Sequence, residues 1–190
     1  MSGFKFTRGF KKQSEEKAIF FRRELGLHPY DPLPAQRLSE YLNIKILTPS
    51  EILEKTSDCY KILISSKEWS ALTLPCMSGN RIIIHNNKNS KYRQESDLMH
   101  ELAHVICEHE TPDNRRIDGF EILLRNYNEQ QEKEAEWLGG CLQLPRDALV
   151  WHIKRNLSVK EIAEVFSASQ TMVRFRINST GVNRQSARWY

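Results

Sequence analysis

The chain of 190 residues is 39% hydrophobic and 27% charged, and 28 Lys and Arg against 24 Asp and Glu give a net charge of +4. This length suits one domain with a small appendage rather than two full domains, and no apolar run approaches the roughly 18 residues of a membrane-spanning helix. The basic segment 1–12 lacks the apolar region of a secretory signal, so we expect a cytoplasmic protein without membrane contact. The mild positive charge permits contact with nucleic acid but does not require it.

The cysteine spacing argues against a cysteine-based scaffold. The chain has four cysteines, none of which forms a C-x-x-C pair: Cys59, Cys76, Cys107 and Cys141. Zinc sites made of four cysteines and disulfide frameworks are usually recognised by short, regular spacings. We therefore expect buried, reduced thiols, as is usual in cytosolic proteins.

The first half of the chain predicts two short helices and a small sheet. Apolar residues at helical spacing over 14–25, with Glu15 and Glu16 in the first turn and Gly26 after the last, indicate one helix. Residues 34–42 indicate a second helix. Four short segments are candidate strands, with a turn at 78–80 between the last two: Ile44–Leu47, Tyr60–Ser65, Ala71–Pro75 and Arg81–His85. The expected sheet is small and antiparallel.

The second half of the chain predicts mainly helices. From about Lys91, four apolar residues fall on one helical face: Leu98, Leu102, Val105 and Ile106. A charged loop over Thr111–Asp118 follows, and helical spacing returns from Glu129 to about Leu142, where Pro145 stops it. Helices continue over 145–179. Together with the sheet, these helices predict an α+β fold.

The sequence HELAH at 100–104 carries the clearest chemical signal. On a helix, His100 and His104 project from one face a single turn apart, where both imidazoles can bind one metal ion. Glu101 lies about 100° around the helix, beside the ion, where it can take a proton from a metal-activated water. The histidines lie opposite the apolar stripe, which favours this interpretation over two surface histidines on an amphipathic helix.

A site with two histidines needs a third protein ligand, which the acidic helix 129–142 can supply. Glu132 and Glu136 share one face of that helix, whereas Glu134 lies on another. Gly139 lies on the Glu132 face, where the missing side chain would let this helix approach the HELAH helix closely. We choose Glu132 as the third ligand and expect Glu136 to accept a hydrogen bond from a ligand imidazole. Zinc is the expected metal, although the same residues could hold manganese or iron.

Two further side chains follow the HELAH sequence closely. If the helix continues, His109 lies about 140° from His104 and is a poor fourth ligand, so a surface or core-rim position is expected. Cys107 falls near the ligand face, where it either lines the site or is a buried structural thiol.

HELAH, together with EKEAEWLGGCLQLPRDAL over residues 132–149, resembles the ImmA/IrrE family of zinc metallopeptidases, and the resemblance covers most of the chain. It implies a zincin-like fold in which His100, His104 and Glu132 bind the metal and Glu101 is the catalytic glutamate. It also implies a cytoplasmic endopeptidase that inactivates a partner repressor by limited cleavage, often encoded on mobile elements or acting in a stress response. In such folds the strand before the metal helix, here Arg81–His85, can bind an extended substrate through its backbone.

Some features depart from the family pattern. Glu136 stands where relatives usually have Asn or Asp, and Leu138-Gly139 stands where many have Phe-Ala. Many relatives carry an N-terminal helix-turn-helix domain for which this chain has no room, so the DNA-reading repressor is expected to be a separate chain. We expect a metallopeptidase body over 1–156 and a helical segment over 157–190 that packs on it.

The C-terminal segment supports a competing hypothesis. Ser158 with Glu161 forms a capping box, and Ser169 can cap the next helix, so this segment resembles a helix-turn-helix. Arg174 and Arg176 on the second helix could contact DNA phosphates or bases. A DNA-binding or regulatory protein is therefore the alternative function, and a metal-binding pseudo-enzyme that acts by binding alone is a third.

Overall fold

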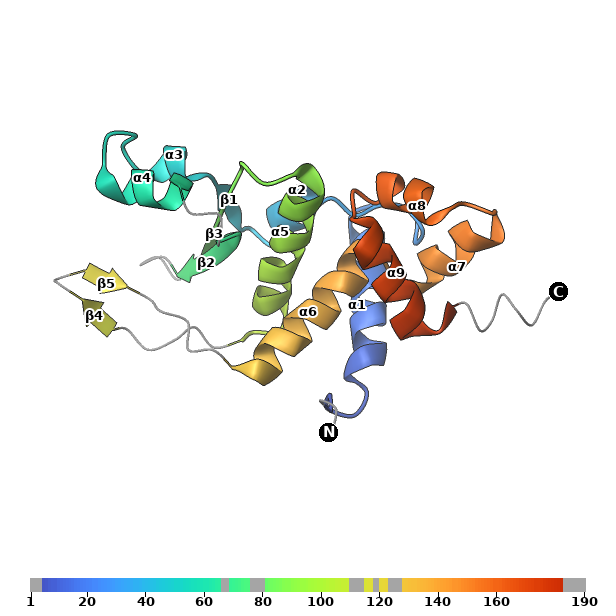
Figure 1. Cartoon of the computed structure of the whole chain (residues 1–190). Helices are drawn as coiled ribbons and strands as arrows, with labels where there is room; N and C mark the ends of the chain where they lie inside the picture. Colours follow the sequence, from blue (N-terminus) through green and yellow to red (C-terminus); the bar gives the residue numbers. More distant parts are fainter. Residues whose placement is uncertain are drawn as a thin grey trace.

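The structure, a computed structural model, describes residues 5–65, 69–75, 81–109, 115–117, 120–122 and 128–182. In these ranges the helices are α1 (Phe10–Glu24), α2 (Ala35–Tyr41), α3 (Pro49–Ile52), α4 (Asp58–Ser65), α5 (Lys91–Ile106), α6 (Glu129–Gln143), α7 (Arg146–Lys154), α8 (Val159–Val165) and α9 (Gln170–Thr180). The strands are β1 (Lys45–Leu47), β2 (Ala71–Pro75), β3 (Arg81–His85), β4 (Arg115–Ile117) and β5 (Phe120–Ile122). The fold is α+β, as expected. Figure 1 shows the strands at one end of an elongated molecule, α5 and α6 near its centre and α7–α9 at the other end.

The main sheet is mixed rather than antiparallel. Its strand order is β1-β3-β2. Strand β2 pairs antiparallel with β3, Thr73 opposite Ile83, whereas β1 pairs parallel with β3, Ile46 opposite Ile83. Parallel pairing requires a long connection, and α3, α4 and β2 lie between these two strands in the chain. Because β3 is bonded on both sides, the expectation that Arg81–His85 binds a peptide through its backbone is wrong.

Residues 60–65, expected as a strand, belong to helix α4. The Tyr60 N–H donates to Ser57 Oγ (3.2 Å), and the Lys61 N–H donates to the Ser57 carbonyl (3.2 Å). Asp58 lies in the first turn, where the helix dipole favours a carboxylate. A short apolar run does not distinguish a strand from a helix. The Ser57 cap is the local signal that the strand prediction overlooked.

One strand lies in the segment expected to be a charged loop. Strand β4 falls within Thr111–Asp118 and pairs antiparallel with β5, which lies beyond that segment, Arg115 opposite Ile122. The β4 sequence, RRI, is short and begins with two arginines, so it carries little strand signal. The turn expected at Ser78–Asn80 lies outside the described residues.

Helix α1 begins earlier than its sequence predicted. It starts at Phe10, so Ser14 is an internal residue whose hydroxyl donates to the Phe10 carbonyl (2.9 Å). Glu15 therefore lies beyond the first turn and makes tertiary contacts instead of stabilising the helix dipole. The predicted terminator is confirmed, because α1 ends at Glu24, Leu25 is its C-cap, and Gly26 follows with a left-handed φ of 66°.

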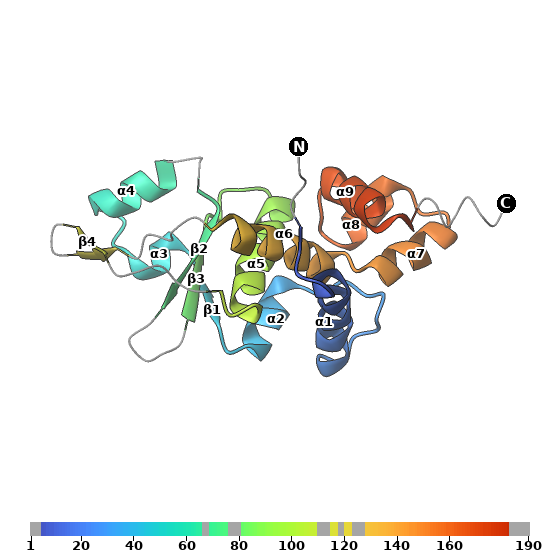
Figure 2. The same ribbon diagram turned by 90° about the horizontal axis from the view of Figure 1, so that it is seen from below.

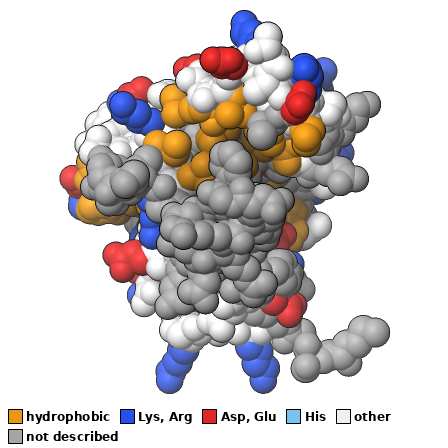
Figure 3. All heavy atoms as spheres, turned by 90° about the vertical axis from the view of Figure 1, so that its left-hand side faces the viewer, with side chains coloured by type: hydrophobic (Ala, Val, Ile, Leu, Met, Phe, Trp, Pro, Cys, Tyr) orange, Lys and Arg blue, Asp and Glu red, His pale blue; other side chains and the backbone are white. Residues whose placement is uncertain are grey.

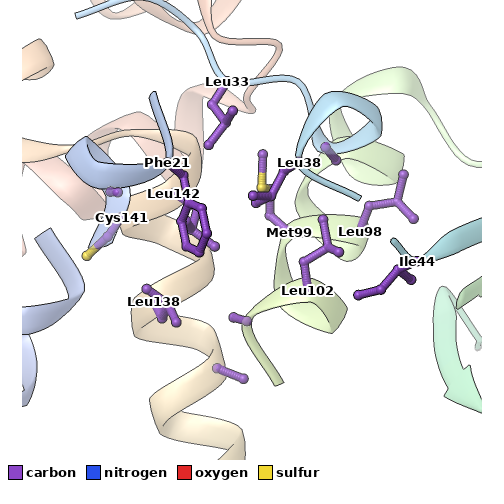
Figure 4. Close-up of a cluster of buried hydrophobic side chains, with 14 of the residues drawn as sticks. Phe21, Leu33, Leu38, Ile44, Leu98, Met99, Leu102, Leu138, Cys141 and Leu142 are labelled. Atoms are coloured by element: carbon purple, nitrogen blue, oxygen red, sulfur yellow. The ribbon is translucent and has the colours of Figure 1, made fainter. Parts of the chain in front are cut away.

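The main hydrophobic core holds α5 against α6. Figure 4 shows Leu138 and Leu142 of α6 facing Met99 and Leu102 of α5, with Phe21 of α1 alongside. All four of the α5 and α6 side chains are fully buried, and burial of each contributes about 1.5–3 kcal/mol. This packing fixes the relative position of the two helices that carry the candidate metal ligands.

A second hydrophobic cluster joins α7, α8 and α9 at the end of the molecule opposite the sheet (Figure 2). Its buried members are Leu144, Ala148, Leu149, Ile162, Ala163, Phe166, Ala168, Val173, Ile177 and Val182. The predicted caps are confirmed: Ser158 and Glu161 form a capping box, and Ser169 Oγ accepts a hydrogen bond from the Met172 N–H (3.0 Å). The helix-turn-helix-like segment is thus built around a local core.

The end of the molecule that carries α3 and α4 presents hydrophobic side chains to solvent. Ile62 of α4 is 66% exposed and Ile52 of α3 is 39% exposed. Figure 3 views the molecule from this end and shows hydrophobic side chains gathered near the top of the face. Exposed apolar surface of this kind often marks an interaction site. None of the described helices has the length and hydropathy needed to cross a bilayer.

Candidate metal centre

Two histidines lie side by side on α5. The helix begins at Ser90, whose Oγ accepts a hydrogen bond from the Arg93 N–H (3.4 Å), and runs to Ile106. His100 and His104 are one turn apart, and their Nε2 atoms lie 3.0 Å from each other. The His104 side chain is 2% exposed, whereas that of His100 is 30% exposed. The pair is therefore buried on one side and open to solvent on the other.

Glu132 of α6 faces both histidines. Asn128 caps α6 through its side chain, which places Glu132 in the first turn. Its Oε2 lies 3.2 Å from Nε2 of His100, and its Oε1 lies 3.4 Å from Nε2 of His104. Potential ligand atoms of the three residues all lie within 4.8 Å of one another. The structure thus brings together the three side chains that the sequence predicted as metal ligands.

The donor set and its spacing fit a zinc ion. Zinc binds nitrogen and oxygen ligands at about 2.0–2.2 Å in tetrahedral sites, so its ligand atoms lie about 3.3 Å from one another. The corresponding distances in this cluster are 3.0, 3.2 and 3.4 Å. Two imidazoles and one carboxylate leave one tetrahedral position for water or substrate. The cluster could therefore hold a catalytic metal ion.

Gly139 explains how closely α6 approaches α5. A Cβ at this position would lie 3.1 Å from the Met99 carbonyl oxygen and 3.2 Å from the backbone nitrogen and Cα of His100. These atoms belong to the backbone of the helix that carries both histidines, so they cannot rotate away as a side chain can. The close approach predicted for the glycine on the Glu132 face is confirmed.

Replacement of Gly139 by leucine is expected to weaken zinc binding at least about tenfold, since displacing a site by about 1 Å can reduce its function a hundredfold. The new side chain must separate the helices that carry Glu132 and His100. Chelator competition measures the affinity, and circular dichroism checks the fold. Gly139→Ala is the matched control, because it needs a shift of only a few tenths of an ångström, so its zinc affinity should fall much less than that of Gly139→Leu. Wild-type affinity in Gly139→Leu would contradict the role of this contact.

Glu101 lies beside the cluster. The residue is 5% exposed, and its Oε2 accepts a hydrogen bond from Thr73 Oγ1 of β2 (2.6 Å). Asp97 lies one turn before Glu101 on α5, and burial raises its pKa. Arg93, whose Nε lies 3.6 Å from Asp97 Oδ2, and His100 oppose this rise, whereas the charge of Glu101 increases it. Sequence reasoning selected Glu101 but missed Thr73, because a strand position does not reveal which helix it faces.

His109 and Glu134 lie on the Nδ1 side of His104, away from the cluster. They were not identified as a pair from the sequence. Nδ1 of His109 lies 2.9 Å from Nδ1 of His104, and its Nε2 lies 3.2 Å from Oε2 of Glu134. His109 is 6% exposed. The angle of about 140° between His109 and His104, expected for a continuous helix, does not apply, because α5 ends at Ile106.

Glu136 and Cys107 have surroundings that differ from those expected near the metal. Glu136 does not accept a hydrogen bond from a ligand imidazole as predicted; it pairs with Lys133 (2.9 Å) at the surface. Burial raises the pKa of the Cys107 thiol, an effect that Lys17 opposes and Glu134 increases. Cys107 packs against the main core as a free thiol, so the structural alternative is favoured.

The two arginines considered for DNA contact differ in burial. Arg176 is 0% exposed, and its guanidinium donates to the Leu144 carbonyl (3.0 Å) and to the Glu15 carboxylate (2.6 Å). The prediction that Arg176 contacts DNA is therefore wrong. Arg174 is exposed and donates to Gln170 Oε1 (3.3 Å) on the same helix.

The fold and the cluster define a class of protein: an α+β domain in which one helix carries HExxH and a neighbouring helix brings a glutamate to both histidines. A family model, Peptidase_M78, described as the IrrE N-terminal-like domain, matches residues 40–178. The chain belongs to this family, which confirms the resemblance to ImmA/IrrE proteins and indicates a metallopeptidase. The match extends from α2 to α9, so the helix-turn-helix-like segment is part of the family domain. A comparison with curated proteins finds no match.

Proposed function

We propose that the protein is a zinc-dependent endopeptidase that inactivates a transcriptional repressor by limited cleavage. The observation that carries the proposal is the cluster of His100, His104 and Glu132, with Glu101 on the helix of the two histidines. The family match supports peptidase chemistry. The solvent-exposed side of the cluster gives a polypeptide access to it.

The roles of the residues follow from their positions. His100, His104 and Glu132 would hold the ion, and a zinc ion bound there would supply Lewis-acid activation of water and of the scissile carbonyl. Glu101 is the general base, which takes a proton from water and passes it to the leaving amine. Thr73 donates to Oε2 of this carboxylate and so restricts its orientation.

We assign peptide binding to the edge of β2. In the described part of the chain, β2 pairs on one side only, with β3. An extended peptide can add to such an edge through backbone hydrogen bonds. Because Thr73 of β2 contacts Glu101, a peptide paired with this strand would pass close to the general base. The β2 edge thus replaces β3 as the proposed binding strand.

The proposed substrate is a helix-turn-helix repressor on a separate chain in the cytoplasm. This part of the proposal, with a role in a stress response or on a mobile element, rests on the family resemblance. The exposed Ile52 and Ile62 support recognition of a protein surface in addition to the cleaved segment.

Metal analysis and repressor cleavage test the proposal together. Wild type and His100→Ala are each co-expressed with helix-turn-helix repressors of the same genome, and new N-termini are identified by mass spectrometry. We expect zinc in the purified wild type, one specific new N-terminus in the repressor, and neither in His100→Ala. Metal-free wild-type protein, with equal cleavage by His100→Ala, would contradict the proposal.

DNA binding is a second candidate function, favoured by the capped helix pair α8 and α9. A mobility-shift assay with wild type, Arg174→Ala and Glu101→Gln tests it. Arg174 is the appropriate position because Arg176 is buried. A shift that is lost in Arg174→Ala and kept in Glu101→Gln would favour DNA binding, whereas no shift by the wild type would exclude it.

Replacement of Thr73 by valine is expected to lower kcat about tenfold and to leave KM nearly unchanged. Valine has the shape of threonine but cannot donate to Glu101, and a hydrogen bond to a charged group is worth about 1.5–3 kcal/mol. Steady-state kinetics on the purified repressor separate kcat from KM. Thr73→Ser keeps the hydroxyl and should restore most of kcat. An unchanged kcat in Thr73→Val would show that this hydrogen bond does not position the base.

A further inference from the structure

The His104 ring is contacted at both of its nitrogens. Nε2 faces the cluster, 3.0 Å from His100 Nε2 and 3.4 Å from Glu132 Oε1. Nδ1 lies 2.9 Å from Nδ1 of His109. The His104 side chain is 2% exposed, and its contact with His109 is buried. The orientation of this ring therefore depends on His109 as well as on the cluster.

His109 is in turn contacted by Glu134 of α6. Nε2 of His109 lies 3.2 Å from Glu134 Oε2, and the other oxygen of this carboxylate accepts a hydrogen bond from Gln130 Nε2 (3.0 Å). The Glu134 side chain is 14% exposed and that of His109 is 6% exposed. The contacts form a continuous chain from a carboxylate on α6 through His109 to His104.

The backbone at the end of α5 places His109 against His104. Glu108 has a left-handed φ of 55°. The Glu108 N–H donates to the Val105 carbonyl (3.0 Å), and the His109 N–H donates to the His104 carbonyl (3.0 Å). These two bonds define a Schellman motif, in which the residue after the reversal usually makes a hydrophobic contact with the last turn. Here that contact joins two imidazoles, whose ring centroids are 4.9 Å apart.

Metal binding by His104 would determine the position of every proton in this chain. A metal-binding Nε2 carries no proton, so neutral His104 carries its proton on Nδ1. That Nδ1–H donates to Nδ1 of His109. His109 must then carry its own proton on Nε2, from which it donates to the Glu134 carboxylate. Both hydrogen bonds are directed away from the metal, and the second ends on the Glu134 carboxylate.

We propose that His109 and Glu134 are positioning residues that fix the tautomer and ring orientation of His104 and thereby strengthen zinc binding. The inference rests on the proposed function, because it requires that His104 binds zinc. Hydrogen-bond partners of metal-binding histidines typically contribute about 10–100-fold to metal affinity. His109 is therefore neither a fourth ligand nor a surface histidine.

Zinc affinity of the apoprotein, measured by competition with a chromophoric chelator, tests this role. His109→Phe keeps a ring of similar size but removes both nitrogens, and we expect it to bind zinc about 10–100-fold more weakly. His109→Asn keeps an acceptor close to the Nδ1 position and should recover much of the affinity. Glu134→Ala breaks the chain at its other link and should lower the affinity on the order of tenfold. Because the two links are tested at different residues, the result does not depend on the folding of one variant.

Nuclear magnetic resonance of the histidine nitrogens in the zinc-loaded wild type provides a second readout. We expect the proton of His104 on Nδ1 and that of His109 on Nε2. A proton on Nδ1 of His109 would overturn the inference, and so would wild-type zinc affinity in both His109→Phe and Glu134→Ala; either result leaves the proposed function in place. A wild type that binds no zinc contradicts the proposed function itself, and this separate measurement distinguishes the two failures.

Discussion

Cleavage of the repressor is expected to fall at least about a hundredfold when Glu101 is replaced by glutamine, since general base catalysis typically contributes 10²–10⁴-fold. Glutamine has nearly the same shape and can still accept the hydrogen bond from Thr73 (2.6 Å), but it cannot take a proton from water. Zinc content should remain that of the wild type, because Glu101 lies outside the cluster of His100, His104 and Glu132. Initial cleavage rates and metal analysis on the same preparation measure both quantities.

Glu136→Gln is the matched control for this experiment. It makes the same chemical change at a surface residue that pairs with Lys133 (2.9 Å), so cleavage and zinc content should both stay unchanged. Repressor inactivation by Glu101→Gln at the wild-type rate would select the alternative in which the protein acts by binding alone. Loss of zinc from Glu101→Gln would contradict the placement of Glu101 outside the ligand set.

Replacement of Glu15 by alanine is expected to destabilise the fold by about 3 kcal/mol, at the lower end of the range for a broken buried ion pair. The Glu15 carboxylate accepts hydrogen bonds from Arg176 Nη2 (2.6 Å) and from the Arg146 N–H at the start of α7 (2.9 Å). The Arg176 side chain is 0% exposed, so its charge loses this counterion without gaining access to water. We choose the lower end because the Glu15 side chain is itself 24% exposed. For a chain of this size the loss corresponds to a Tm lowered by roughly 6–12 °C.

Glu16→Ala is the matched control on the same helix. Glu16 pairs with Lys12 (3.5 Å) at the surface, where both side chains are largely exposed, so its removal should cost at most about 0.5 kcal/mol. Adding Arg176→Met to Glu15→Ala removes both charges and should make the combined loss smaller than the sum of the single losses. Strictly additive losses in thermal or chemical denaturation would contradict the electrostatic explanation.

The two helices that carry the candidate ligands, α5 and α6, could be predicted from the sequence because their signals are local. The start of α5 at Lys91, after its cap Ser90, and the end of α6 before Pro145 follow from capping residues and apolar spacing. The shorter elements could not be predicted in the same way. Residues 60–65 contain a short apolar run, 62–64, which suits either a strand or a helix. The parallel pairing of β1 with β3 depends on the path of the intervening chain, which periodicity does not report.

The same distinction applies to the candidate site. His100, Glu101 and His104 lie within one helical turn, so 3.6 residues per turn determine their relative positions before any tertiary structure forms. The helical phase also indicated which face of α6 carries Glu132. That phase argument failed for Glu136, because sharing a face with Glu132 does not guarantee contact with a histidine.

By itself, the sequence determined the α+β composition, the HExxH geometry, the acidic helix that supplies Glu132 and the need for a small residue at Gly139, since each depends on spacing within one element. Only the tertiary structure decided which strand is central and which residues support the cluster. Thr73 reaches Glu101 across a strand–helix contact, and Glu134 of α6 reaches His109 in the turn after α5. His109 itself depends on where α5 stops: the left-handed backbone of Glu108 turns its ring toward His104, although a glycine does not mark this position. Contacts between elements depend on packing and on chain reversals, and those are properties of the whole fold.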